Sequence, residues 1–163
     1  MMAWDKGGSG WDNSPVAPTG EREAAGWLLE IHDLPAESPG GFVTSATACT
    51  LSCLGTARRE LLKREGWDFD QDGLTGAPEI RVVISALAHI TVIKALRVLG
   101  FGLRHLVIAP VNERGQVDIA RLPELNNRTI LCLQAGEVNS GEFDDFENII
   151  PLAKAAGSWV HVD

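Results

Sequence analysis

The feature that most constrains the fold of this chain is an alternation of short, continuously apolar segments with longer amphipathic ones. The apolar segments lack the every-second-residue polarity of a strand with one wet face. They predict strands at Ile80–Ser85, Leu106–Ile108, Thr129–Leu133 and Trp159–Val162. Continuous apolar strands separated by helices are typical of a parallel sheet. The predicted fold class is therefore α/β: a mostly parallel sheet with helices on both faces.

The remaining elements follow from apolar spacing and from helix-ending glycines. Helices are predicted at about Thr19–His32, Ala46–Glu65, His89–Leu99, Val117–Leu122 and Phe143–Ala156. Phe42–Thr44 is predicted to be a short strand, and 67–78 a polar loop. Residues 1–18, rich in Gly, Pro, Ser and Asp, are predicted to form an irregular arm, and 19–163 a partial domain.

Composition limits the kind of partner. The 163 residues suffice for one domain with a core, and 45% are hydrophobic. The formal net charge of −8 argues against a nucleic acid or an anionic membrane surface as partner. No apolar run approaches the roughly 18 residues of a membrane span. The first ten residues lack the apolar core of a signal peptide, so a cytoplasmic location is expected.

The three cysteines, Cys49, Cys53 and Cys132, are an odd number. Cys49 and Cys53 lie four residues apart on a predicted helix, so a metal site formed by these two thiols is one alternative. The sequence has no CxxC motif and no clustered histidines. Buried free thiols are therefore expected, and no metal.

Small and hydroxylated residues open the helix that begins at Ala46. Ser45, Ala46 and Thr47 would let an anion reach the free N–H groups of the first turn, where the helix dipole favours negative charge. This is a candidate phosphate site. The alternative is plain capping of the helix by small residues.

His89 and Asp163 each follow a predicted strand. An imidazole at His89 could stack on a planar cofactor and take part in proton transfer; the alternative is a histidine satisfied by local hydrogen bonds. A carboxylate at Asp163 could keep a pyridine nitrogen protonated; the alternative is an exposed acid at a strand end. His161 is expected to be buried and hydrogen-bonded.

The glycine-rich loop after the strand at Thr129–Leu133 contains Glu137 and Asn139. Loops at this end of a parallel strand commonly meet ligands, so Asn139 is a candidate cofactor contact. The alternative is a simple crossover turn in which Asp144 caps the next helix.

In order and spacing these segments resemble the pyridoxal phosphate (PLP)-dependent amino-acid decarboxylases of the aromatic-amino-acid and glutamate type, which have fold type I, the aspartate aminotransferase fold. The resemblance covers nearly the whole chain. It rests on an ordered set of motifs: Ser14-Pro15, Glu21 to Leu28, Phe42 to Thr47, Ala88-His89, Val111 to Asp118, Gln134 to Asp144 and Trp159 to Asp163.

The resemblance implies roles for these residues. Ser45, Ala46 and Thr47 would bind the cofactor phosphate, His89 would stack on its ring, and Asp163 would hold the ring nitrogen. Asn139 would be a further contact, and the charge of Glu137 nearby would weaken binding. The partners implied are an L-amino-acid substrate and, in the full-length parent, a second copy of the chain.

The family's cofactor-binding lysine comes after the segment matched by Asp163. Lys6, Lys63, Lys94 and Lys154 match no such position. The chain is therefore expected to be a fragment of a PLP-dependent carboxy-lyase, inactive alone. The alternatives are another fold type I enzyme of the aldolase, lyase or desulfurase type, or a non-enzymatic remnant. A NAD-binding domain is disfavoured, because Gly100-Phe101-Gly102 follows a helix rather than a strand.

Overall fold

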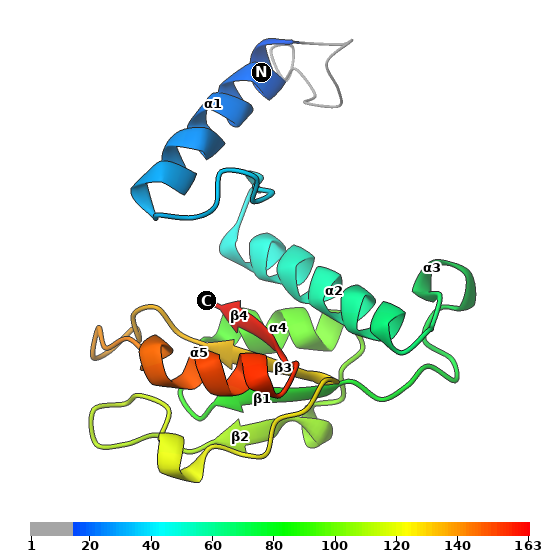
Figure 1. The fold of residues 1–163 in the computed structure, drawn as a ribbon, viewed down its shortest axis with the longest axis vertical. Coiled ribbons are helices and arrows are strands. Elements are labelled where there is room, and N and C mark those ends of the chain that lie inside the picture. The colour runs from blue at the N-terminus through cyan, green and yellow to red at the C-terminus, as the bar shows by residue number, and fades with distance from the viewer. Residues whose placement is uncertain (1–14) are drawn as a thin grey trace. The chain divides into compact units, whose positions relative to one another are not determined.

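The computed structural model describes residues 15–163 (Figure 1). By its internal contacts the chain divides into a unit that ends at Thr44 and a second unit, Ser45–Asp163. The helices are α1 (Val16–Ile31), α2 (Ala46–Arg64), α3 (Phe69–Asp72), α4 (Ile90–Val98) and α5 (Phe146–Ala155). The strands are β1 (Arg81–Ser85), β2 (Val107–Ala109), β3 (Thr129–Leu133) and β4 (Trp159–Val162).

The four strands form one parallel sheet in the order β2-β1-β3-β4. Val83 of β1 pairs with Val107 on one side and Leu131 on the other, and Leu131 pairs with Val160 of β4. The predicted parallel sheet is confirmed, and the predicted bounds of β3 and β4 are those observed.

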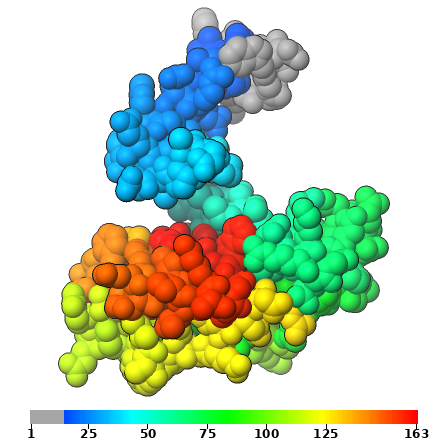
Figure 2. All heavy atoms as spheres, in the orientation of Figure 1, coloured from blue at the N-terminus to red at the C-terminus, as the bar shows by residue number. Residues whose placement is uncertain are grey.

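Helices cover both faces of this sheet, as predicted. Val82 and Ile84 of β1 face a core shared with α2 and α4, whereas Val83 faces a second core shared with α5. Figure 1 shows α4 and α5 on opposite sides of the strands. On the face seen in Figure 2, α5 and the segment between β2 and β3 lie over the sheet, while the red C-terminal end of the chain stays in view. Burial of both faces explains the continuous apolar runs.

The ends of the helices in this unit follow local chemistry. Ser45 caps α2 by accepting a hydrogen bond from the N–H of Ala48 at 3.2 Å. Gly66 and Gly100, just after α2 and α4, have φ of +79° and +83°, which glycine adopts without strain. The polar loop predicted at 67–78 contains one helical turn, α3.

The first unit departs from two predictions. Helix α1 begins at Val16 rather than at Thr19, inside the predicted arm, whose residues 1–14 lie outside the described part. Thr19 lies inside the first turn of this helix, and its hydroxyl donates to the carbonyl of Pro15 at 2.6 Å. Pro18 is tolerated because N–H groups of the first turn have no partner within the helix.

The strand predicted at Phe42–Thr44 is wrong. These residues form no ladder, and the backbone N–H of Phe42 donates instead to the Glu21 carboxylate at 3.0 Å. A strand needs a neighbour for its backbone groups, and among residues 15–163 the segment pairs with no strand.

Two predicted helices are shorter than expected. The segment Val117–Leu122 contains only a 3-10 turn, Ile119–Arg121. Helix α5 begins at Phe146, because Asp145 rather than Asp144 caps it. Asp144 is buried, and its carboxylate accepts from the N–H groups of Val117 at 2.7 Å and Gln134 at 2.8 Å. No helix among residues 15–163 is both long and apolar enough to cross a membrane.

Candidate functional site

The candidate residues gather at the carboxyl end of the parallel sheet. Since the strands run in one direction, β1, β3 and β4 end at the same edge. His89 lies in the loop after β1, Asn139 in the loop after β3, and Asp163 directly after β4. This edge is where open parallel sheets bind ligands.

The main chain holds Asp163 in line with the sheet. Its N–H donates to the carbonyl of Leu133 at 2.9 Å, and its own carbonyl accepts from the N–H of Ala135 at 2.8 Å. These two bonds continue the β3–β4 ladder by one residue. The backbone of the candidate acid is therefore fixed by the sheet.

The Asp163 carboxylate is exposed and lies beside α2. Its Oδ1 is 3.5 Å from the hydroxyl of Thr50, but that hydroxyl has one proton and a closer acceptor, the Ala46 carbonyl at 3.0 Å. The shorter bond takes the proton. The carboxylate thus keeps its acceptor capacity for another group.

The first turn of α2 carries unused donors. The N–H of Ala48 donates to the Ser45 hydroxyl and that of Cys49 to the Ser45 carbonyl. The N–H groups of Ala46 and Thr47 have no acceptor within the described chain, as is usual at the start of a helix. The small side chains here leave these donors open to an anion.

His89 is the N-cap of α4. Its Nδ1 lies 2.8 Å from the Thr91 hydroxyl and accepts from the Thr91 N–H at 3.4 Å. The local hydrogen bonding anticipated as the alternative for this histidine is therefore present. Because β3 lies between β1 and β4, the ends of those two strands are about 10 Å apart, two strand spacings.

Glu137 and Asn139 bond to each other. The Glu137 carboxylate accepts from the Asn139 side-chain amide at 2.7 Å and from the backbone N–H groups of Asn139 and Ser140 at 2.9 and 2.8 Å. The Ser140 N–H is the largest of the effects that lower the pKa of Glu137. Glu137 is buried and fastens its own loop, and the contact of Asn139 with a cofactor stays a prediction.

Two residues that lie beside Asp163 were not identified as candidate site residues from the sequence. His161 and Cys132 pair across β4 and β3, and both are buried. Burial, and after it the charge of Asp163, raise the pKa of Cys132 to about 12. Burial lowers the pKa of His161, and Asp163 opposes this. The sequence signal is that residues 161 and 163 share a face of their strand, which has a period of two.

Two expectations about single side chains are wrong. Nε2 of His161 is buried without a hydrogen-bond partner, so only the expected burial holds. Cys49 and Cys53 are exposed, because they lie on the side of α2 turned away from its buried residues. No group of three potential metal ligands occurs within residues 15–163.

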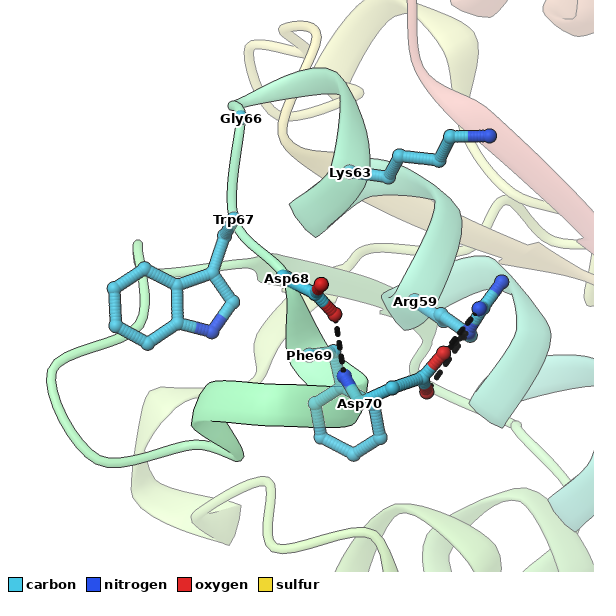
Figure 3. Close-up of a pocket in the computed structure, with 7 residues that line it drawn as sticks. All are labelled: Arg59, Lys63, Gly66, Trp67, Asp68, Phe69 and Asp70. Atoms are coloured by element: carbon cyan, nitrogen blue, oxygen red, sulfur yellow. Dashed lines mark hydrogen bonds and ion pairs between the residues drawn. The ribbon is translucent and has the colours of Figure 1, made fainter.

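A separate pocket lies at the far end of α2, away from these residues (Figure 3). Its volume is about 330 Å³, and Trp67 and Phe69 contribute its aromatic rings. Figure 3 shows Arg59 of α2 facing Asp70 of α3, with which it forms an ion pair. The charges of Arg59 and Asp70 thus neutralise each other, and no residue of the candidate cofactor site lines this pocket.

Known proteins resemble this chain along nearly its whole length. Curated relatives include an L-2,4-diaminobutyrate decarboxylase of Acinetobacter baumannii, 25% identical, and tryptophan decarboxylase 1 of Oryza sativa subsp. japonica, 28% identical. Each match covers 94% of this chain and 33% of the relative. The chain therefore spans about a third of the length of these relatives.

Solved structures agree in fold. The glutamate decarboxylase domain of the Vibrio parahaemolyticus diaminobutyrate-pyruvate transaminase and L-2,4-diaminobutyrate decarboxylase superposes with a TM-score of 0.83 at 24% identity, over 94% of this chain and 36% of that one. The Oryza sativa TDC with PLP gives 0.78 at 25% identity, over 96% and 36%. The pyridoxal-dependent decarboxylase conserved domain matches residues 3–163, so the chain belongs to the pyridoxal-dependent decarboxylase family.

Proposed function

We propose that this chain supplies a large part of the cofactor cradle of a PLP-dependent decarboxylase, a carbon–carbon lyase acting on an L-amino acid. The observation that carries the proposal is the exposed carboxylate of Asp163, whose backbone the sheet fixes at the end of β4, beside the first turns of α2. The relatives named above are decarboxylases of different amino acids, which supports the substrate class rather than one substrate.

The donors and acceptors at this edge fit the chemistry of the cofactor. A phosphate needs N–H and hydroxyl donors, and the first turn of α2 offers the N–H groups of Ala46 and Thr47 with the Thr47 hydroxyl. A protonated pyridine nitrogen needs an anionic acceptor, and Asp163 is one. His89, at the N-cap of α4 after β1, provides a flat ring two strands away from β4.

Each residue then has a distinct part in the reaction. When bound, PLP would supply an electron sink for the carbon–carbon bond that breaks as carbon dioxide leaves. Asp163 would hold the proton on the ring nitrogen, and His89 would restrict the ring's orientation. Ser45, Ala46 and Thr47 would anchor the phosphate, and Asn139 is retained as a candidate contact.

We propose further that the 163-residue chain does not by itself attach the cofactor to a lysine. None of the lysines in the described part lies at the carboxyl end of the sheet. Lys63 is next to the last residue of α2, Lys94 is exposed in the middle of α4, and Lys154 is next to the last residue of α5. Binding should then be noncovalent, with a dissociation constant of roughly micromolar to millimolar.

Incubation with PLP, borohydride reduction and peptide mapping test this proposal. The expected result is PLP binding without specific labelling of one lysine and without release of carbon dioxide from L-amino acids. Stoichiometric labelling of one lysine together with measurable carbon dioxide release would contradict it.

Two variants test the site by PLP titration. Thr47→Ala removes a candidate phosphate donor, and Thr56→Ala, further along α2, is the matched control. His89→Asn removes the ring but keeps a good capping side chain for α4. Both site variants should weaken PLP binding several-fold, and the control should not. Unchanged binding in both would mean that the site is assigned to the wrong residues.

A homodimeric parent and a cytoplasmic location remain proposals, supported by the family resemblance and by the composition. Analytical ultracentrifugation and cell fractionation of the parent protein test them. A monomer at micromolar concentration would refute the first, and recovery outside the cytoplasm would refute the second.

A further inference from the structure

Arg58 is a buried cation without a carboxylate partner. It lies on α2, the residue is only 8% exposed, and its Nη1 donates to the backbone carbonyl of Leu99. Its Nε is buried without any acceptor. Within residues 15–163 it takes part in no ion pair, although Arg59, the next residue, has Asp70.

Aromatic rings compensate the charge of Arg58 only in part. The guanidinium carbon lies 4.7 Å from the ring centre of Phe69 and 5.9 Å from that of Phe101. Such contacts stabilise a cation, but less than a bidentate carboxylate does. Burial lowers the pKa of Arg58, yet a guanidinium stays protonated at neutral pH. Within residues 15–163, the buried positive charge of Arg58 therefore has no anionic partner.

Arg58 lines a pocket of about 500 Å³, within the usual size of small-molecule sites. Most of the other lining residues are apolar: Leu62, Leu74, Ala77, Pro78, Ile80, Leu99 and Phe101. Glu79 and His105, both exposed, are the other ionisable residues there. Ile80 directly precedes β1, so the pocket lies at the opposite end of this strand from the candidate cofactor site.

We propose that this pocket binds a small carboxylate with an apolar body, whose carboxylate pairs with Arg58. Nη1 is bonded to Leu99 and Nε is enclosed, so Nη2, which has no hydrogen-bond partner within residues 15–163, is the nitrogen that can donate to a carboxylate, and the apolar wall accepts the rest of the molecule. Two sources share this chemistry. One is a simple carboxylic acid, and the other is an apolar α-amino acid whose ammonium group meets Glu79. The site is independent of the proposed reaction.

The probe is 3-phenylpropionate, titrated into the 163-residue chain by calorimetry, with neutral 3-phenylpropionamide as the matched ligand. Arg58→Gln removes the buried charge, and Arg59→Gln removes an exposed one next to it as the matched control. Ala77→Phe fills the pocket while leaving Arg58 in place. Circular dichroism establishes which variants are folded.

The acid should bind with a millimolar or tighter dissociation constant, and the amide at least tenfold more weakly. Arg58→Gln and Ala77→Phe should each weaken binding of the acid at least tenfold, and Arg59→Gln should leave it unchanged. Absence of binding to the wild-type chain, or equal binding of acid and amide, would overturn the proposal. If Arg58→Gln does not fold, Ala77→Phe and the pair of ligands decide.

L-Phenylalanine separates the two sources. If it binds at least as tightly as 3-phenylpropionate and Glu79→Gln weakens only the amino acid, the site takes an α-amino acid. If it binds at least tenfold more weakly, the site takes a simple carboxylic acid. Both results support the pairing with Arg58, whereas amino-acid binding that survives Arg58→Gln in a folded variant contradicts it.

Discussion

Helices α1 and α4 have similar sequence patterns and opposite burial. In α1, apolar residues recur at helical spacing, yet Trp27 and Ile31 are 64% and 72% exposed. In α4, the same spacing buries Val92 and Leu96 completely or nearly so. Indeed, no residue from 15 to 44 is buried, whereas 45–163 contains two apolar cores. The pattern predicts a helix and its apolar face, but not whether this chain also supplies the surface that covers it.

The largest expected contrast comes from one substitution made in both regions. Leu96→Ala in α4 opens a cavity in the core and should lower the free energy of unfolding by about 2–5 kcal/mol. Leu28→Ala in α1 removes a side chain that is not buried, and should change the free energy of unfolding by no more than about 0.5 kcal/mol. Urea unfolding followed by circular dichroism measures both. Equal losses would show that the two regions do not differ in packing as described.

Association should depend on the first region. The exposed apolar residues of α1 form a stripe that can bind other chains, so the wild-type chain is expected to associate at rising concentration. Replacing Trp27 and Ile31 together by serine should shift size-exclusion elution toward the monomer. The control, Val98→Ser, changes one residue of α4 that is 72% exposed. A compact wild-type monomer at all concentrations would remove the basis of this prediction.

Among residues 15–163, buried polar side chains occur only in the second region. One of them, His161, makes the stability of that region depend on pH. Burial lowers its pKa, so the folded state disfavours the protonated ring. Its contribution to stability is complete above the ordinary imidazole pKa of about 6.5 and is lost as the pH falls through the folded value. His161→Asn should therefore lose less stability than wild type between pH 7 and 5. If the free energy of unfolding falls equally with pH in the two proteins, this prediction is contradicted.

The smallest contrast concerns two glutamates. Buried Glu137 accepts three hydrogen bonds within its loop, whereas exposed Glu21 accepts one within residues 15–163, from the N–H of Phe42. The pKa of Glu137 is lowered, so its contribution is complete above the ordinary value of about 4.3 and is lost as the pH falls through the folded value. Glu137→Gln should lower the melting temperature at pH 7. As the pH falls, the melting temperature of this variant should also decrease less steeply than that of wild type. Glu21→Gln should change neither, and equal effects would contradict the contrast.

Local patterns predicted the sheet well because its two central strands, β1 and β3, are buried on both faces. The bounds of β3 and β4 could be read from their mainly apolar residues, and the end of α2 from Gly66. Phe42–Thr44 has the composition of a strand, but pairing depends on a distant segment that local sequence does not reveal. Asp144 and Asp145 could both cap α5. A bond from Asp144 to the distant Val117 N–H leaves the capping to Asp145.

The candidate site could be predicted in outline because it, too, depends on local sequence patterns. Asp163 and the first turn of α2 are recognisable because strand ends and helix starts have fixed chemistry. The Glu137–Asn139 bonds and the unpartnered Nε2 of His161 depend on how side chains meet in space. Sequence spacing does not determine such contacts.

The most direct test of the cofactor cradle is PLP binding by Asp163→Asn, compared with Asp72→Asn. Both substitutions remove one negative charge, but Asp72 is the last residue of α3, outside the sheet. Absorbance titration with PLP, between pH 6 and 9, measures the affinity and the protonation of the ring. Asp163→Asn should weaken binding at least tenfold and lower the pH at which the ring nitrogen loses its proton, while Asp72→Asn matches wild type. Equal affinity and equal spectra in both variants would contradict the assignment of Asp163 and, with it, the cradle.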